Sequence, residues 1–477
     1  MLLRSRFLRN WSFLALSGIV CQLLGILATI RIARALTPEG YGQYNLVQTL
    51  AGLGVVLAGL GLRQVVIREC ARHPERSADI FHTSAILRAL ALAAAGAGIL
   101  IYSQIGTQGL SIAFGAVVLG MLVGRSTFDL VEGVVFGHER MGYSTGINLV
   151  GSTVWVVAAW SVPDTWLTPF NVSLAFALLE GGKGLVYSLL ARKAGFVRFN
   201  PSPWATQGRS MQRFLLSQSL PLYWLALLTA ATNELPIVFL AGRSGQAEVG
   251  LYNAGSKLIS PMLLVIMTAL AALYPGLSLA GVADGSRFLR TIRLSLLSIS
   301  LFGAAGATTI SFLRQELVLL LFGPAYQLTA DAMAFQCWFT VLMAIYSLIG
   351  TTLAARDRQK WLAFLSSVYT VLSLPILWFG AGYGATGLAT AILLGAILNL
   401  PYHWAAFQRS LPQPLSTPFA LAVLLILGTG MILGWAVPQT WPWSTRALLA
   451  VLVSAGYFSV VVQLRPLTGT PRTGLVS

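Results

Sequence analysis

The sequence predicts an all-α polytopic membrane protein, with about fourteen transmembrane helices. Hydrophobic residues make up 56% of the 477-residue chain and charged residues only 10%, whereas soluble domains carry about 25% charged residues. Apolar runs of roughly 20 residues follow one another, and this is the length that a helix needs to cross a bilayer core of about 30 Å. A membrane β-barrel would show alternating segments of about 10 residues instead. The runs therefore predict helices.

The predicted spans lie at residues 11–33, 45–66, 83–103, 111–136, 143–161, 168–191, 217–241, 252–275, 291–313, 328–353, 361–380, 384–407, 417–437 and 445–463. Arg4, Arg6 and Arg9 precede the first span, as they would precede a signal peptide. That span is longer than the roughly 7–15 apolar residues of a signal peptide, and no small-residue cleavage site follows it. We expect it to be retained.

The basic residues predict the orientation. If the N-terminus is cytoplasmic, most of the basic loop residues fall on cytoplasmic segments. The outer segments then hold only Arg31, Arg34, Arg243, Arg314 and Arg446. Such a bias is typical of membrane proteins, and it predicts that both termini are cytoplasmic. It also explains the net charge of +16 without nucleic acid as a partner.

A short repeat predicts two similar halves. GQYN at residues 42–45 recurs as GLYN at residues 250–253, an offset of 208 residues (250 − 42). Each copy lies at the start of a span that is predicted to run from outside to inside. Repeats with the same orientation occur in transporters, which bind substrate between the repeats near the bilayer midplane.

The predicted organisation is two pseudo-symmetric six-helix lobes, followed by an extra helix pair. The N-terminal lobe covers residues 1–195, and a cytoplasmic linker rich in Pro, Ser and Gly covers 196–214. The C-terminal lobe covers 215–410. An additional transmembrane pair and a cytoplasmic tail complete the chain at 411–477.

Charged side chains inside the spans are the candidate substrate-binding residues, because they are costly in a bilayer and mark functional sites. The candidates are Arg125, Lys183, Asp129, Glu180 and Arg88. Arg125 lies roughly 18 Å from the inner end of its helix, at 1.5 Å per residue. Asp129 follows Arg125 by one turn, and Glu180 precedes Lys183 by three residues, so each pair shares a helix face. These residues line a partly cationic cavity or form two local ion pairs. Arg88 lies near an inner helix end and can snorkel to the interface.

Two further sets of charges are candidates. Glu234 and Lys257 have equal depth on adjacent predicted helices, so they form a structural ion pair or, alternatively, a gate or coupling site. Arg31 and Arg34 flank the outer end of the first span, where they anchor at lipid headgroups or line an outer mouth.

No motif predicts an enzyme. GYGATG at residues 382–387 matches GxGxxG, but membrane spans flank it in place of the βαβ unit that a dinucleotide site requires. The four histidines are scattered, and the three cysteines form no CxxC pair. There is no Walker A sequence. We therefore expect no metal site, no cofactor and no catalytic activity.

Four stretches resemble bacterial polysaccharide flippases: residues 33–72, 233–258, 317–333 and 382–392. These flippases are the Wzx-type members of the multidrug/oligosaccharidyl-lipid/polysaccharide (MOP) exporter superfamily. The dipeptide at 233–234, Asn-Glu, departs from the Asp followed by a basic or apolar residue that is common in relatives. The resemblance implies a multi-pass protein of the bacterial cytoplasmic membrane. It implies translocation of polyprenyl-diphosphate-linked oligosaccharide by alternating access, for cell-surface polysaccharide biosynthesis. Membrane lipid, the lipid-linked glycan and a polysaccharide polymerase are the implied partners.

The main alternative is a cation-coupled drug or small-molecule antiporter of the same superfamily. Such a protein needs an acid within the membrane, and the first span has none, although Glu180 and Glu234 remain available. A membrane-bound glycosyltransferase would normally carry catalytic acids in a long loop. The longest predicted loop, residues 192–214, contains neither Asp nor Glu.

Overall fold

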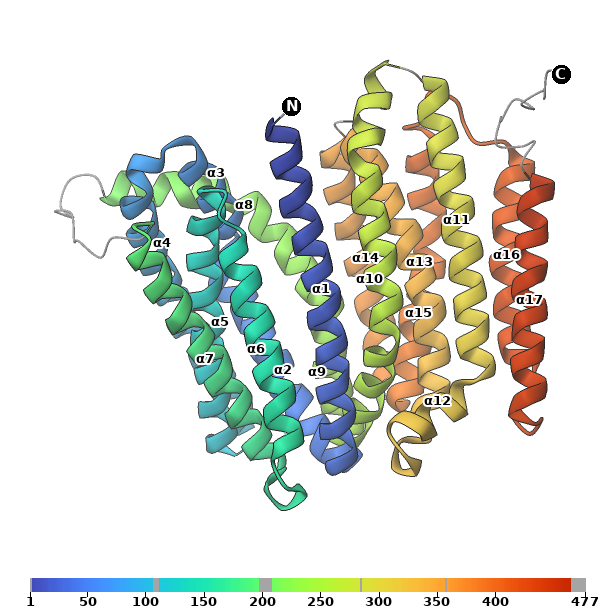
Figure 1. Cartoon of the computed structure of the whole chain (residues 1–477), viewed down its shortest axis with the longest axis horizontal. Helices are drawn as coiled ribbons and strands as arrows, with labels where there is room; N and C mark the ends of the chain where they lie inside the picture. The colour runs from blue at the N-terminus through green and yellow to red at the C-terminus, as the bar shows by residue number, and fades with distance from the viewer. Residues whose placement is uncertain (1, 106–110, 197–207, 284, 357, 465–477) are drawn as a thin grey trace. The chain divides into compact units, whose positions relative to one another are not determined.

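The computed structural model describes residues 2–105, 111–196, 208–283, 285–356 and 358–464, and these residues contain helices and turns but no strand (Figure 1). The all-α prediction is thus confirmed for the described chain. Most of the predicted linker (197–207) and the tail from residue 465 lie outside the described residues.

The helices that precede residue 245 are α1 (Leu2–Ala35), α2 (Pro38–Gly59), α3 (Leu62–Arg72), α4 (Ser77–Ile105), α5 (Ile112–Gly137), α6 (Gly142–Ser161), α7 (Pro169–Lys193), α8 (Gly208–Asn233) and α9 (Leu235–Ser244). Those that follow are α10 (Gln246–Ala283), α11 (Gly285–Phe312), α12 (Arg314–Leu321), α13 (Thr329–Ala355), α14 (Gln359–Ala381), α15 (Gly384–Gln408), α16 (Thr417–Ala436) and α17 (Trp443–Leu464). Short 3-10 turns are η1 (Pro74–Arg76), η2 (Asp164–Trp166) and η3 (Pro324–Tyr326).

Each predicted span overlaps one or two helices of the structure. Fewer than fourteen of these helices, however, are long and apolar enough to cross a membrane. Ten helical segments of the described chain are long and apolar enough to cross a membrane, or eleven if α2 and α3 together form one bent span. The chain is therefore a multi-pass membrane protein, and the number fourteen stays a prediction.

Two of the predicted continuous spans are broken. The span expected at 45–66 is interrupted where Leu60 and Gly61 adopt left-handed backbone angles (φ 49° and 66°), and α3 leaves α2 at a bend of 50°. The span expected at 217–241 is divided between α8 and α9. Because α3 is a separate helix, its side chains point in directions that a straight helix could not give them.

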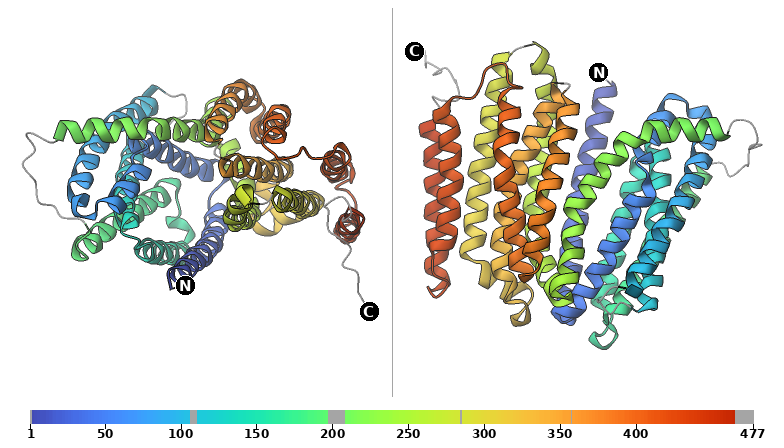
Figure 2. Two further views of the ribbon diagram at one scale, coloured as in Figure 1. Left: turned by 90° about the horizontal axis from the view of Figure 1, so that it is seen from above. Right: turned by 180° about the vertical axis from the view of Figure 1, so that it is seen from behind.

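Contacts divide the chain into two compact units, residues 1–253 and 254–477. In the first unit, α5 packs against α7 and α4, α1 packs against α6, and α2 contacts α4, α5 and α7. Helix α8 crosses the ends of α3 and α4 and then turns to run beside α2 (Figure 2). In the second unit, α15 packs against α13 and α14, and α11 packs against α13, α16 and α17.

The repeated tetrapeptides meet inside the first unit. A Cβ atom added at Gly42 would lie 1.7 Å from the carbonyl oxygen of Gln246, and one added at Gly250 would lie 1.9 Å from that of Pro38. The two contacts are equivalent, because Gln246 follows Pro38 by the same 208 residues (246 − 38) that separate the glycines. The first turns of α2 and α10 therefore cross with their backbones in direct contact.

The asparagines of the two repeats also make equivalent hydrogen bonds. The side-chain amide of Asn45 donates to the Tyr41 carbonyl at 2.7 Å, and that of Asn253 donates to the Val249 carbonyl at 2.9 Å. Both asparagines are buried. The two tetrapeptides thus have equivalent backbone contacts and equivalent asparagine hydrogen bonds, and the two-lobe organisation stays a prediction.

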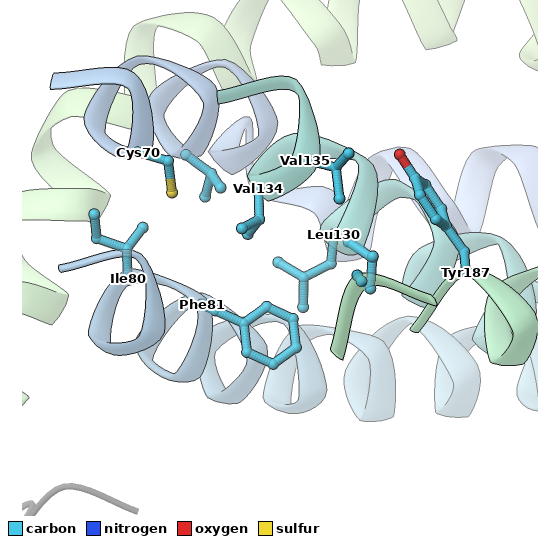
Figure 3. Close-up of a cluster of buried hydrophobic side chains, with 10 residues drawn as sticks. Cys70, Ile80, Phe81, Leu130, Val134, Val135 and Tyr187 are labelled. Carbon is cyan, nitrogen blue, oxygen red and sulfur yellow. The ribbon is translucent and has the colours of Figure 1, made fainter. Parts of the chain in front are cut away.

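A buried apolar cluster joins one end of α3, α4, α5 and α7 (Figure 3). Its members are Val66, Cys70, Ile80, Phe81, Leu130, Val131, Val134, Val135, Tyr187 and Ala191. Since α3 and α4 pack here against α5, the polar residues one or two turns further along these helices are also brought close together.

Two buried arginines join the C-terminal helix pair to the rest of the second unit. Arg446 of α17 is 2% exposed, donates to the Phe312 carbonyl at 2.7 Å and forms an ion pair with Glu316. Arg314 of α12 donates to Asp331 at 3.1 Å and to the Gly434 carbonyl of α16 at 3.4 Å. These contacts attach α16 and α17 to α11, α12 and α13.

Candidate substrate site

The helices that carry the central candidate residues approach each other through glycines. A Cβ at Gly124 of α5 would lie 2.6 Å from the backbone nitrogen of Gly181 in α7. Arg125 follows Gly124 in α5, and Glu180 precedes Gly181 in α7, so this contact brings Arg125 and Glu180 together.

The first polar group is built around Glu180. Its carboxylate accepts a hydrogen bond from Lys183 at 3.0 Å and forms an ion pair with Arg125 at 3.7 Å. Arg125 also donates to the side chain of Gln48 on α2, at 3.1 Å, and to the Gln48 carbonyl at 3.4 Å. We call these four residues the central group.

Aromatic rings flank the central group. The guanidinium of Arg125 lies 5.6 Å from the centre of the Phe176 ring, and the ammonium of Lys183 lies 5.3 Å from that of Phe128. The side chain of Arg125 keeps 24% of its surface exposed and that of Lys183 keeps 17%, against 10% for Glu180. The cations are therefore more accessible than the carboxylate that they share.

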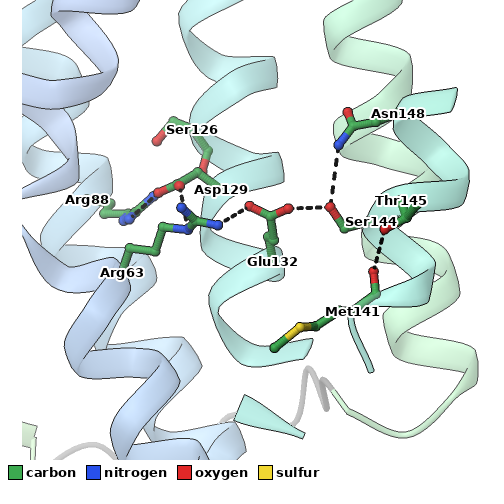
Figure 4. Close-up of polar contacts among 9 residues, drawn as sticks. All are labelled: Arg63, Arg88, Ser126, Asp129, Glu132, Met141, Ser144, Thr145 and Asn148. Atoms are coloured by element: carbon green, nitrogen blue, oxygen red, sulfur yellow. Dashed lines mark hydrogen bonds and ion pairs between the residues drawn. The ribbon is translucent and has the colours of Figure 1, made fainter. Parts of the chain in front are cut away.

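The second polar group lies further along α5, where α3, α4 and α6 meet that helix (Figure 4). Asp129 accepts from Arg88 at 2.6 Å and forms an ion pair with Arg63 at 3.2 Å. Arg63 also donates to Glu132 at 2.5 Å, and Glu132 accepts from the hydroxyl of Ser144. We call Arg63, Arg88, Asp129, Glu132 and Ser144 the α5 network.

Two expected interactions are wrong. Asp129 is not the partner of Arg125, because it faces α3 and α4 and is occupied by Arg63 and Arg88. Nor does Arg88 snorkel to an interface, since it is only 3% exposed and donates to the Ser126 carbonyl at 3.2 Å as well as to Asp129. The expected pair of Glu180 and Lys183 is confirmed.

Sequence reasoning missed Gln48 and Arg63. Gln48 carries no charge, so a search for charged residues within spans passes over it. Arg63 lies at the inner end of the span predicted at 45–66 and was not among the candidates, yet it belongs to the first turn of α3 after the bend. The Leu60–Gly61 break was the available signal, because a glycine within an apolar run often marks a helix end.

The other candidates are placed as follows. Arg31 forms an ion pair with Asp164 at 2.5 Å and donates to the Val162 carbonyl at 3.2 Å, which joins α1 to the turn after α6. Arg34 is exposed. A Cβ at Gly52 of α2 would lie 3.4 Å from Glu234, so that carboxylate lies against α2.

The proposed pairing of Glu234 with Lys257 stays a prediction, because the two residues belong to different units. Among the described residues, no group of three or more His, Cys, Asp or Glu side chains could hold a metal ion.

Comparison with known proteins identifies the family. A family model described as "Polysaccharide biosynthesis protein" matches residues 7–280, which include both polar groups. No curated protein sequence matches the chain.

Solved structures share the fold over most of the chain. The lipid II flippase MurJ, in an inward closed conformation, is 11% identical with a TM-score of 0.60, over 95% of this chain and 99% of that one. An inward-facing multidrug resistance MATE transporter of the MOP superfamily is 15% identical with a TM-score of 0.58, over 82% and 95%. A mutant of the Vibrio cholerae MATE transporter VcmN is 15% identical with a TM-score of 0.54, over 84% and 94%. The expected likeness to this superfamily is confirmed.

Proposed function

Because the chain belongs to the polysaccharide biosynthesis protein family, we propose that it is a flippase of lipid-linked oligosaccharide. The substrate would be a glycan on a polyprenyl diphosphate, moved across the bacterial cytoplasmic membrane by alternating access for cell-surface polysaccharide biosynthesis. Both termini would be cytoplasmic, and a polysaccharide polymerase would use the exported glycan. Family membership and the likeness of the fold to flippases and transporters support this proposal.

The charge of the central group is the observation that carries the proposal. Arg63 and Arg88 are balanced by Asp129 and Glu132 in the α5 network (2 − 2 = 0), whereas Arg125 and Lys183 share Glu180 alone (2 − 1 = +1). The excess positive charge therefore belongs to the two partly exposed cations.

A diphosphate fits this arrangement chemically. It presents several anionic oxygens, so it can accept hydrogen bonds from Arg125 and Lys183 together and displace Glu180 as their shared partner. Charge-assisted hydrogen bonds of this kind are the strong ones. Gln48 can contribute an amide donor at the same place. The uncharged polyprenyl tail would remain in lipid.

The antiporter alternative rests on Glu180, the acid of the central group. A transported cation would have to compete with Arg125 at 3.7 Å and Lys183 at 3.0 Å for this carboxylate. An anionic substrate would instead gain both cations as partners. The flippase is therefore the better explanation of the charge distribution.

The decisive experiment measures the leaflet in which the lipid-linked glycan resides. In cells that lack the protein, we expect the intermediate to accumulate on the cytoplasmic leaflet, protected from an impermeant glycan-modifying enzyme. A normal distribution would contradict the flippase function and favour the antiporter, for which Glu180 and Glu234 would be tested next.

Variants of the central group test the site. We expect Arg125→Ala and Lys183→Ala to lower export roughly tenfold to a hundredfold, since a hydrogen bond to a charged group contributes about 1.5–3 kcal/mol. Arg140→Ala, at an exposed position in the turn before α6, is the matched control and should export normally. Normal export by both central variants, at membrane levels equal to the control, would refute the assignment.

A further inference from the structure

A buried histidine in the second unit lies among three tyrosine rings. His403 of α15 is 6% exposed. Its ring centre lies 4.7 Å from that of Tyr346, 6.3 Å from that of Tyr369 and 4.5 Å from that of Tyr402. These rings come from α13, α14 and α15 itself, and α13 and α14 pack closely on α15.

The hydrogen bonds of His403 determine which nitrogen is free. Nδ1 lies 3.0 Å from the carbonyl oxygen of Asn399. A carbonyl oxygen only accepts, so Nδ1 carries the proton of the neutral ring and Nε2 holds the lone pair. Among the described residues, no side chain forms a hydrogen bond with Nε2. This nitrogen is therefore available to a proton.

A polar chain extends from the same place. The Tyr402 hydroxyl donates to the Asn399 side chain, whose amide donates to Ser373 of α14 at 3.3 Å. Asn399 and Ser373 are only 1% and 2% exposed. The cluster thus links α14 to α15 through buried polar atoms.

Few charged residues lie on or beside the surrounding helices. The nearest along the chain is Arg409, just after α15, which follows His403 by six residues (409 − 403), roughly 9 Å, and is exposed. Arg356 and Arg358 lie between α13 and α14. α15 contains none, α13 contains Asp331 alone and α14 contains Lys360 alone. Asp331 lies fifteen residues before Tyr346 (346 − 331), roughly 22 Å along the helix, and Lys360 lies nine before Tyr369 (369 − 360), roughly 14 Å. A protonated His403 would therefore face aromatic rings and neutral polar groups, without a carboxylate.

We propose that His403 is a proton-binding site that couples transport to the proton gradient. The three tyrosine rings surround the imidazole, and the proton would bind at Nε2. The same cluster offers no counter-charge, so protonation favours a conformation in which the ring is better hydrated. A ligand with different affinities for two conformations shifts their equilibrium, and the proton here is that ligand.

The position of the site suits such a shift. Pro401 lies within α15, and Pro375 lies within α14. Each proline leaves one backbone carbonyl of its helix without a donor, which allows a bend next to the cluster. The chain has four histidines, and His403 is the one in the second unit.

The first test is a titration that is independent of transport. The triple variant H73Q/H82Q/H138Q leaves His403 as the sole imidazole. In lipid nanodiscs, its ¹⁵N ring resonances should change reversibly between about pH 4 and 8, the range in which imidazoles in proteins titrate. An unchanged neutral ring over this range would overturn the proposal.

The second test measures coupling and rests on the proposed flippase function. In proteoliposomes, the movement of a polyprenyl-diphosphate-linked oligosaccharide is compared with and without an imposed pH gradient. We expect stimulation of roughly 5- to 150-fold, the usual range of coupling between two binding equilibria. It should be lost in His403→Gln and kept in His82→Gln.

The two proposals can fail separately. Equal stimulation of His403→Gln and the wild type would overturn the proton site and leave the flippase intact. A wild-type protein that moves no glycan would contradict the flippase, and the titration of the triple variant would still decide whether His403 binds a proton.

Discussion

The crossing of α2 and α10 allows a sharp prediction about stability. A Cβ at Gly42 would lie 1.7 Å from the Gln246 oxygen, and real contacts below 3.0 Å essentially do not occur. The helices would therefore have to separate by at least 1.3 Å (3.0 − 1.7). Because the obstacle is backbone within a helix, it cannot move aside as a flexible side chain would.

We expect Gly42→Ala and Gly250→Ala each to destabilise the protein by about 3 kcal/mol, the upper end of the usual cost of overpacking. In detergent, the midpoint of thermal unfolding should fall by roughly 3 °C, because an unfolding entropy of about 2.1 cal/mol/K per residue amounts to about 1 kcal/mol/K for the 477-residue chain. The double variant should lose little more than either single variant, since one separation of the helices relieves both contacts.

Gly98→Ala is the matched control. It also replaces a helix glycine, but a Cβ there meets nothing within 4 Å, so its unfolding midpoint should not fall. Midpoints for Gly42→Ala and Gly250→Ala equal to that of the control would refute the close crossing. If the losses of stability of the two single variants added up in the double variant, the two glycine contacts would not be relieved by one separation of the helices.

Two further substitutions test the ion pairs. Asp129→Asn removes the carboxylate partner of Arg88, whose side chain is 4% exposed. It should lower the free energy of unfolding by about 3–5 kcal/mol. An unfolding midpoint equal to that of the wild type would contradict the buried pair. Arg446→Met keeps the volume but removes the contacts with Glu316 and the Phe312 carbonyl, so proteolysis between α15 and α16 should become faster. Unchanged cleavage would show that the helix pair is held by other contacts.

The sequence was sufficient for the helices and for the charged residues that they bury. Apolar runs of about 20 residues identify spans with little ambiguity, and a charge within such a run is easily noticed. The pair of Glu180 and Lys183 was predictable because both residues lie on one helix, where spacing determines proximity.

Partners on different helices were not predictable. Arg125 and Asp129 share a face of α5 by spacing, yet the rotation and tilt of the neighbouring helices direct them to different partners. The bend at Leu60 and Gly61 turns α3 so that Arg63 reaches Asp129 and Glu132. The rotation of α3 depends on its packing against neighbouring helices, and this packing cannot be predicted from spacing within a single sequence.

The two predicted halves share the order of their helices but differ in the charged residues that those helices carry. If α7 and α15 are counterparts, as the predicted layout has them, α7 carries Glu180 and Lys183 whereas α15 carries no charged residue. The repeat is therefore conserved where backbones must meet, at Gly42 and Gly250. The proposed anion site in the first half and the proposed proton site in the second therefore use different residues of the two halves.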